Sequence, residues 1–239
     1  MRTSLFLIIS LCANQAFATC DISPTKLTAS YQITATDGTK HHTSELVLWR
    51  NGKTVAHQYP QTHITESWYL AKNQLIKPTR FFDNEQRAIE YQPGEKVHGK
   101  AESDWNYRYK LISDTLLSQL NVQQETGAGC EQTRIYTKSM GDTKIEVRYL
   151  TQQNLVSYYS WQKGSTQEVW TLQNVTSDTR KINVFFDRRA AYQSTDFADI
   201  GDDHSDAFLT KMVTLGFIEK GASGFYDDKG HALDGGHQH

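Results

Sequence analysis

Residues 45–59 read ELVLWRNGKTVAHQY, two runs of apolar, aromatic and β-branched side chains separated by Asn51-Gly52. Asn-Gly favours the positive φ angles of a type I′ turn, whose twist matches that of two antiparallel strands. The stretch therefore predicts a β-hairpin whose strands are residues 45–50 and 53–59.

Similar short runs continue on both sides of this hairpin. From Leu27 to Ile33 every second side chain is apolar, and the turn pair Asp37-Gly38 follows, which is typical of a strand with one wet face. Further strands are expected at 64–70, 74–82, 87–92, 133–138, 144–149, 155–161, 168–175 and 181–187. Turn residues separate these runs, and the spacing of about 8–12 residues per strand indicates an antiparallel meander.

The period changes between residues 102 and 123. Apolar side chains recur there at separations of three and four, which predicts one amphipathic helix with a break near Ser113-Asp114. These side chains are Trp105, Tyr109, Ile112, Leu116, Leu117 and Leu120. A second, short helix is expected at residues 207–215, where Ser205 or Asp206 can cap its N-terminus.

The pattern as a whole indicates a mainly β (α+β) fold. We expect a strongly curved antiparallel meander sheet, or open barrel, of about ten strands, with one central helix and a short C-terminal helix. A sheet this long must twist, curl or close, and a helix laid across it covers its apolar face. A two-sheet sandwich is the competing architecture.

The N-terminus carries the features of an export signal. Arg2 precedes an apolar run over residues 5–11, and Ala16-Phe17-Ala18 supplies the small residues that signal peptidase recognises. We therefore expect residues 1–18 to be removed and the product to be periplasmic or secreted. The apolar run is shorter than the roughly 20 residues that span a bilayer, so no stable membrane span is expected after cleavage.

Two cysteines, Cys20 and Cys130, remain after such cleavage. In an oxidising compartment an even pair most simply forms one disulfide. The alternative, a metal-binding or redox pair, lacks the close spacing that such sites use. We therefore predict a single β-rich domain over residues 19–217, bridged by this bond.

Charge excludes one class of partner. The chain has 239 residues, with 25 Lys and Arg against 27 Asp and Glu, and a pI near 6.5. A chain whose positive and negative charges nearly cancel produces no positive field that would attract nucleic acid. We expect no nucleic-acid partner.

The strand and turn pattern at residues 155–164 and 168–175, with the run at 181–187, resembles the open-barrel fold of the bacterial lipoprotein-localisation carriers. The resemblance extends in pattern over most of residues 26–187. In that family the sheet and its helical lid enclose an apolar cavity that accepts acyl chains. It would imply a carrier of a hydrophobic small molecule, a lipid or an acylated envelope protein.

Aromatic side chains are frequent among the predicted strands and the central helix. Large rings can line an apolar cavity, and the candidates for ligand binding are Trp105, Tyr109, Trp161 and Trp170. The same residue types are also good strand formers that pack across strands, so an ordinary packing role is the alternative.

Histidines and aspartates near the C-terminus form the candidate metal site. Residues 218–239 are rich in glycine and histidine, and we expect this segment to be a flexible tail. Imidazole is a good ligand for copper or zinc, and nearby carboxylates can complete the coordination sphere. The candidate ligands are Asp202, Asp203, His204, His231, His237 and His239. A solvated tail without a ligand is the alternative.

The sequence favours a binding role over a catalytic one. It contains none of the Gly-x-Ser-x-Gly, His-Glu-x-x-His, phosphate-loop or dinucleotide-binding motifs. The first hypothesis is an exported, soluble, non-enzymatic protein that holds a hydrophobic ligand in the concave face of a curled sheet. The second is a periplasmic metal-handling accessory protein that uses the C-terminal histidines and the Asp-rich loop.

Overall fold

The computed structural model of the chain describes residues 20–97, 100–200, 205–214, 225–226 and 232–233. Two runs of consecutive strands make up most of it. The first run is β1 (Lys26–Asp37), β2 (Lys40–Asn51), β3 (Thr54–Tyr59), β4 (Ile64–Leu70), β5 (Ile76–Phe82) and β6 (Arg87–Glu90). The second is β9 (Asn121–Thr126), β10 (Thr133–Met140), β11 (Thr143–Leu150), β12 (Leu155–Lys163) and β13 (Thr166–Thr176).

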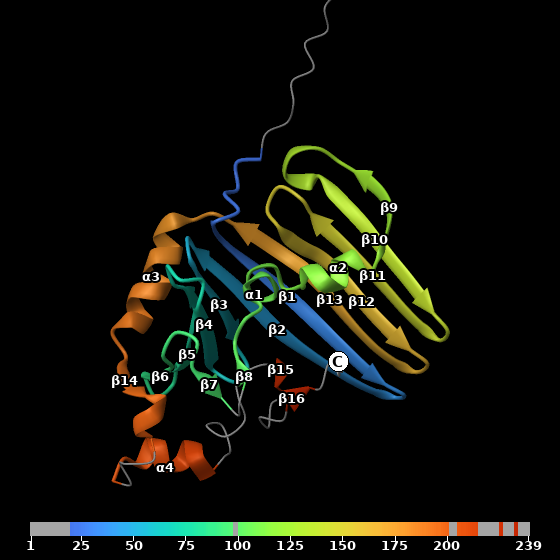
Figure 1. Cartoon of the computed structure of the whole chain (residues 1–239). Helices are drawn as coiled ribbons and strands as arrows, with labels where there is room; N and C mark the ends of the chain where they lie inside the picture. Colours follow the sequence, from blue (N-terminus) through green and yellow to red (C-terminus); the bar gives the residue numbers. More distant parts are fainter. Residues whose placement is uncertain (1–19, 98–99, 201–204, 215–224, 227–231, 234–239) are drawn as a thin grey trace, which may run out of the picture.

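One 12-stranded open sheet contains both runs and β14 (Gln193–Asp196), in the order β14-β6-β5-β4-β3-β2-β1-β13-β12-β11-β10-β9 (Figure 1). Antiparallel pairing of β1 with β13 joins the two meanders, and β14 pairs with β6 in parallel. The predicted curved, mainly antiparallel sheet is confirmed, with twelve strands where about ten were expected.

The predicted hairpin at Asn51-Gly52 is also confirmed. Strands β2 and β3 pair from Asn51 opposite Thr54 to Val47 opposite Gln58. Gly52 has a φ of 64°, the left-handed conformation that this short turn requires and that glycine adopts without steric cost.

Helices cover the two faces of the sheet. We call the face that carries Leu46 and Leu48 the inner face, because the helices α1 (Trp105–Lys110) and α2 (Asp114–Ser118) lie over it, in front of the sheet in Figure 1. The opposite, outer face carries Trp49, against which α3 (Thr179–Ala190) packs.

The single helix expected over residues 102–123 is two short helices followed by a strand. Leu111 ends α1 in a left-handed conformation with a φ of 63°, and Ser113 caps α2 by accepting a hydrogen bond from the backbone N–H of Leu116. The chain then enters β9 at Asn121. The apolar side chains predicted for one helix stripe still face the core, Trp105 and Tyr109 in one cluster and Ile112 and Leu120 in another.

The strand expected at residues 181–187 is wrong, because this segment lies within α3. Ile182, Val184 and Phe186 alternate with other residues, which suggested a strand. The side chains that are buried are Ile182, Phe185 and Arg189, at helical separations of three and four. Asp178 caps the helix by accepting a hydrogen bond from the backbone N–H of Lys181 at 3.0 Å.

Helix α3 is the crossover that carries the chain from the middle of the sheet to its edge. It follows β13, packs across the outer face and precedes β14. Its Arg189 donates a hydrogen bond to Asp83 at 2.6 Å, and the Tyr192 hydroxyl donates to the same carboxylate at 3.1 Å. Thr65 of β4 also donates to Asp83, so this buried network fixes the end of α3 to the first meander.

The remaining described elements are short. They are β7 (Lys96–Val97) and β8 (Lys100–Ala101), the 3-10 turns η1 (Gly129–Glu131) and η2 (Phe197–Asp199), α4 (Ala207–Thr214), β15 (Phe225–Tyr226) and β16 (Ala232–Leu233). The predicted C-terminal helix is α4, and Asp206 caps it by accepting from the backbone N–H groups of Phe208 and Leu209. None of the helices among the described residues has the length and apolarity needed to cross a bilayer.

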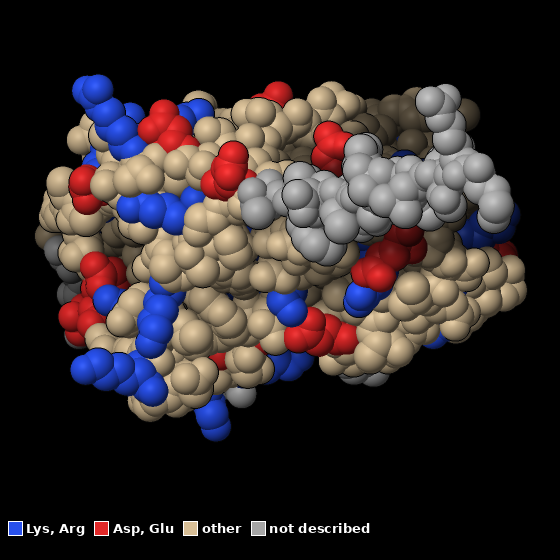
Figure 2. Space-filling view, turned by 90° about the horizontal axis from the view of Figure 1, so that it is seen from above, with Lys and Arg blue, Asp and Glu red and all other residues tan. Residues whose placement is uncertain are grey.

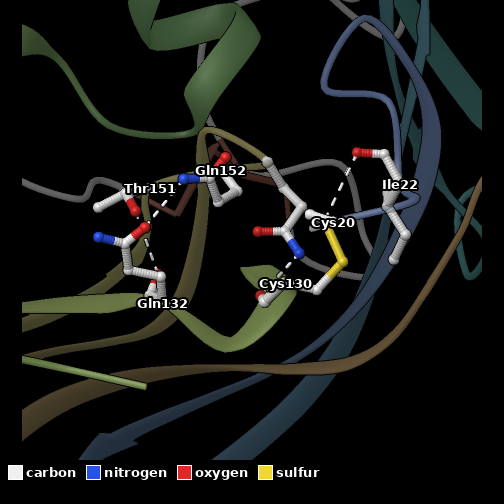
Figure 3. Close-up of a disulfide and its surroundings, with 7 residues drawn as sticks. Cys20, Ile22, Cys130, Gln132, Thr151 and Gln152 are labelled. Atoms are coloured by element: carbon white, nitrogen blue, oxygen red, sulfur yellow. Dashed lines mark hydrogen bonds between the residues drawn. A yellow bond between two sulfur atoms is a disulfide. The ribbon is translucent and has the colours of Figure 1, made fainter. Parts of the chain in front are cut away.

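The predicted disulfide between Cys20 and Cys130 is present and joins the segment that precedes β1 to η1 (Figure 3). The turn between β11 and β12 lies against the same place. Gln152 donates to the side chain of Gln132, and Gln153 donates to the backbone carbonyl of Cys130 at 2.7 Å. The bond therefore lies where the two meanders and the N-terminal segment meet.

Candidate ligand-binding face

The inner face of the sheet carries the largest apolar cluster. Its buried members come from both meanders and include Leu27, Tyr31, Leu48, Val55, Trp68 and Trp170. Trp105 and Tyr109 of α1 pack against this cluster, with their rings 5.7 Å apart. The side chains of α1 thus occupy the middle of the inner face.

Three of the four aromatic residues predicted to bind a ligand lie together. Trp170 belongs to the central cluster that Trp105 and Tyr109 cover. Trp161 lies on the same face of β12 as Tyr159, one step further toward the ends of the strands, and it is half-buried.

Strand register arranges the inner face of the second meander and of the adjoining β1 and β2 in rows, and the second row is more polar than the first. The first row, mostly buried, is Tyr136, Val147, Tyr159, Trp170 and Ile33. The second row, in which every side chain is half-buried, is Lys138, Ile145, Trp161, Glu168, Ala35 and His42. A ligand placed along these rows would meet apolar surface at one end and charged groups at the other.

Arg50 holds α1 to the sheet. This side chain extends from β2 on the inner face and is 0% exposed. Its guanidinium donates to the backbone carbonyl of Tyr109 from both Nε, at 2.9 Å, and Nη2, and it lies 3.9 Å from the centre of the Tyr109 ring. It also donates to the carbonyls of Pro24, Gln153 and Asn154. One buried cation therefore connects α1, the N-terminal segment and the β11–β12 turn.

His57 supplies a second attachment for α1. Its Nε2 lies 2.7 Å from the backbone carbonyl of Arg108, to which it donates. Burial, together with the positive charge of Arg108, lowers the pKa of His57 to about 3. The imidazole is therefore neutral at physiological pH, which suits a single N–H donor toward a carbonyl.

Arg108 is itself buried between α1 and β4. Its guanidinium lies 4.4 Å from the centre of the Trp68 ring and binds Glu102 at 2.6 Å. Burial alone would lower the pKa of Arg108, but the combined effect of Glu102, Tyr107 and Glu66 outweighs it and raises the pKa. The residue stays charged beneath the helix that carries it.

A buried charged pair continues this polar region across the sheet. Glu66 of β4 and Arg80 of β5 are opposite each other in register and only 2% and 1% exposed. Arg80 Nη2 donates to Glu66 Oε1 at 2.8 Å. Such a pair costs several kcal/mol of desolvation for each ion, which geometry and additional hydrogen bonds must offset.

Sequence reasoning did not identify these polar residues, although a signal was present. Each replaces an apolar side chain in an alternating run: Arg50 follows Leu46 and Leu48, and Glu66 stands between Ile64 and Trp68. A charge at a position where the strand pattern requires an apolar residue indicates a buried partner.

On the part of the face in Figure 2 that the described residues form, lysine and arginine side chains are interspersed with aspartate and glutamate. This agrees with the nearly balanced composition and gives no basis on that face for a charge-driven partner.

The residues predicted to bind metal, Asp202, Asp203, His204, His231, His237 and His239, lie outside the described residues. Within the part of the chain that the structure describes, no group of three or more His, Cys, Asp or Glu side chains could hold a metal ion. Asp206, adjacent to the predicted site, pairs with Arg87 at 2.6 Å as well as capping α4.

Comparison with known proteins gives only distant structural likenesses. No family model matches the chain, and no curated protein matches its sequence. Among solved structures it is similar to PNGF-II, with 10% identity and a TM-score of 0.38, over 78% of this chain but only 33% of that one. The chain thus spans about a third of the length of that protein.

Two smaller proteins are similar over most of their own length. A DUF1329 family protein from Desulfovibrio piger shows 10% identity and a TM-score of 0.34, covering 70% of this chain and 90% of that one. A putative outer membrane lipoprotein-sorting protein domain from Vibrio parahaemolyticus shows 8% identity and a TM-score of 0.32, covering 70% and 92%. At these identities and TM-scores the likenesses establish neither a family nor an activity for this chain.

Proposed function

We propose that the protein is an exported, non-enzymatic carrier that binds the apolar part of a ligand on the inner face of its sheet. The ligand class is a lipid or an acylated partner. The observation that carries the proposal is a pair of adjacent rows on the inner face, in which mostly buried aromatic and apolar residues are followed by a half-buried row that combines Trp161 and Ile145 with the charged Lys138 and Glu168.

This arrangement suits a ligand with one apolar and one polar end. Aromatic rings offer large contact area, and an acyl chain gains free energy in proportion to the apolar surface it removes from water. Strands β12 and β13 continue beyond α1 and α2 (Figure 1). The disulfide between Cys20 and Cys130 supports export, because such bonds persist mainly in oxidising compartments.

Fluorescence titration with a long-chain fatty acid below its micellar concentration tests the proposal. We expect saturable binding that Trp161→Ala weakens about tenfold, which corresponds to about 1.4 kcal/mol. Tyr158→Ala is the matched control, because Tyr158 is also aromatic and half-buried in β12 but points to the outer face. Equal loss of binding in both variants, or no saturable binding by the wild-type protein, would contradict the proposal.

A further inference from the structure

A row of three polar side chains crosses the inner face of the first meander beneath α1. His57 lies opposite Glu66 in the β3–β4 register, and Glu66 lies opposite Arg80 in the β4–β5 register. Their exposed fractions are 3%, 2% and 1%. The neighbouring positions along the same face are apolar, for example Val55 and Trp68.

One carboxylate oxygen of this row lacks a hydrogen-bond donor among the residues that the structure describes. Glu66 Oε1 accepts from Arg80, but the buried Glu66 Oε2 accepts no hydrogen bond from any of them. Buried polar atoms are almost always paired, because an unpaired one costs about 1–3 kcal/mol, and more when charged. A purely structural ion pair would therefore be expected to use both oxygens.

The charges around Glu66 define which group would suit the free oxygen. Among the described residues of this row and of α1 above it, Arg80 pairs with Glu66, Arg108 pairs with Glu102, and His57 is neutral. Charges that are already paired favour neither an anionic nor a cationic head group. A carboxylate oxygen can only accept, so its complement is a neutral O–H or N–H donor.

We propose that this row is a polar subsite that binds a hydroxyl or amide N–H group of the ligand, with Glu66 Oε2 as the acceptor. The proposal rests on the proposed function, since the ligand's apolar part would lie on the adjoining apolar cluster, which begins at Val55 and Trp68. Arg108 of α1 lies over this row, where it contacts His57 and Trp68. A bound head group would therefore replace contacts between α1 and the row.

Calorimetry with two matched probes tests the subsite. One probe is a monoacylglycerol, which has two free hydroxyl groups, and the other is the same molecule with both hydroxyls methylated. We expect wild-type protein to bind the hydroxylated probe about tenfold more tightly, because only this probe can donate to Glu66. Glu66→Gln should reduce that preference to less than threefold, since it places N–H donors where the carboxylate accepted.

Glu125→Gln is the matched control, because Glu125 is an exposed carboxylate on β9 that pairs with Arg134. It should keep the wild-type preference. Equal affinity of wild-type protein for both probes would overturn the subsite but leave the carrier function standing. This comparison uses wild-type protein alone, so its outcome does not depend on whether a variant folds. An unchanged preference in folded Glu66→Gln would remove Glu66 from the site. Failure of both probes to bind would overturn the subsite together with the proposed function.

Discussion

Arg50 shows how much of this fold depends on one side chain. Its guanidinium donates to four backbone carbonyls in three segments, two of which are 59 and 103–104 residues from it along the chain. These carbonyls include that of Tyr109 at the C-terminal end of α1, where the helix dipole favours a positive charge. A six-residue helix is not stable by itself, so its position depends on such contacts.

Arg50→Met should therefore lower the free energy of unfolding by at least about 3 kcal/mol, because several buried carbonyls lose their donor. Urea unfolding followed by circular dichroism measures this loss. Arg148→Met is the control, since Arg148 is exposed and bonds Glu146 at the surface; it should change stability by less than about 0.5 kcal/mol. Similar losses in the two variants would contradict the role given to Arg50.

His57 makes a second prediction at this scale, through pH. Burial lowers its pKa to about 3 in the folded protein, below the ordinary value near 6.5 in the unfolded chain. The unfolded state then binds more protons between these values, so the stability from neutral His57 is complete above pH 6.5 and is lost as the pH falls toward 3. The loss should be about 1.4 kcal/mol per pH unit.

Unfolding midpoints at pH 7.5, 5.5 and 4.5 measure this dependence. His57→Gln should be less stable at pH 7.5 but should show a flatter decline on acidification than the wild-type protein. His41→Gln should keep the wild-type slope, because His41 is exposed. Parallel slopes in wild type and His57→Gln would contradict the burial effect.

Elements were predictable where their pattern was local. The β2–β3 hairpin follows from Asn51-Gly52, and the capped helix α4 follows from Asp206 and an apolar stripe. Helix α3 was misassigned because Ile182, Val184 and Phe186 alternate like a strand. Burial by Trp49 on the outer face, which the sequence does not show, selects Ile182 and Phe185 instead.

Substitutions in α3 distinguish the two assignments. The Phe185 ring stacks on Trp49 at 3.8 Å, so Phe185→Ala should cost about 3–5 kcal/mol and change the Trp fluorescence. Val184→Ala should cost less than about 0.5 kcal/mol, because Val184 is exposed. A strand would reverse this order, since it would place Val184 on the same face as Ile182. Chemical unfolding of both variants decides between them.

At the scale of the molecule, the joining of the two meanders could not be predicted from the sequence. Pairing of β1 with β13 brings together residues more than 120 positions apart, from Thr28 opposite Thr176 to Asp37 opposite Thr166. No local pattern specifies such a contact. The cover over the buried polar row was missed for the same reason, since Arg108 reaches His57 and Trp68 only after α1 crosses the inner face.

The disulfide is a second long-range contact, in this case a covalent one. Cys20 and Cys130 are 110 residues apart, so their bond encloses the first meander with α1 and α2. In the chain-entropy model, closing a loop of this size lowers the entropy of the unfolded chain and so stabilises the folded state by about 4–5 kcal/mol, an upper value for real bridges. The hydrogen bond from Gln153 to the Cys130 carbonyl does not depend on the sulfur atoms.

We therefore expect Cys20→Ser/Cys130→Ser to keep the native circular dichroism spectrum but to unfold at a lower urea concentration than the oxidised wild type. Reduced wild-type protein should behave like the variant, because both lack the same restriction on the unfolded chain. The reductant should have no effect on the variant, which controls for any other action of the reagent. Unequal spectra in the native state would show that the bond shapes the fold itself, and equal midpoints would show that the loop closure contributes no net stability.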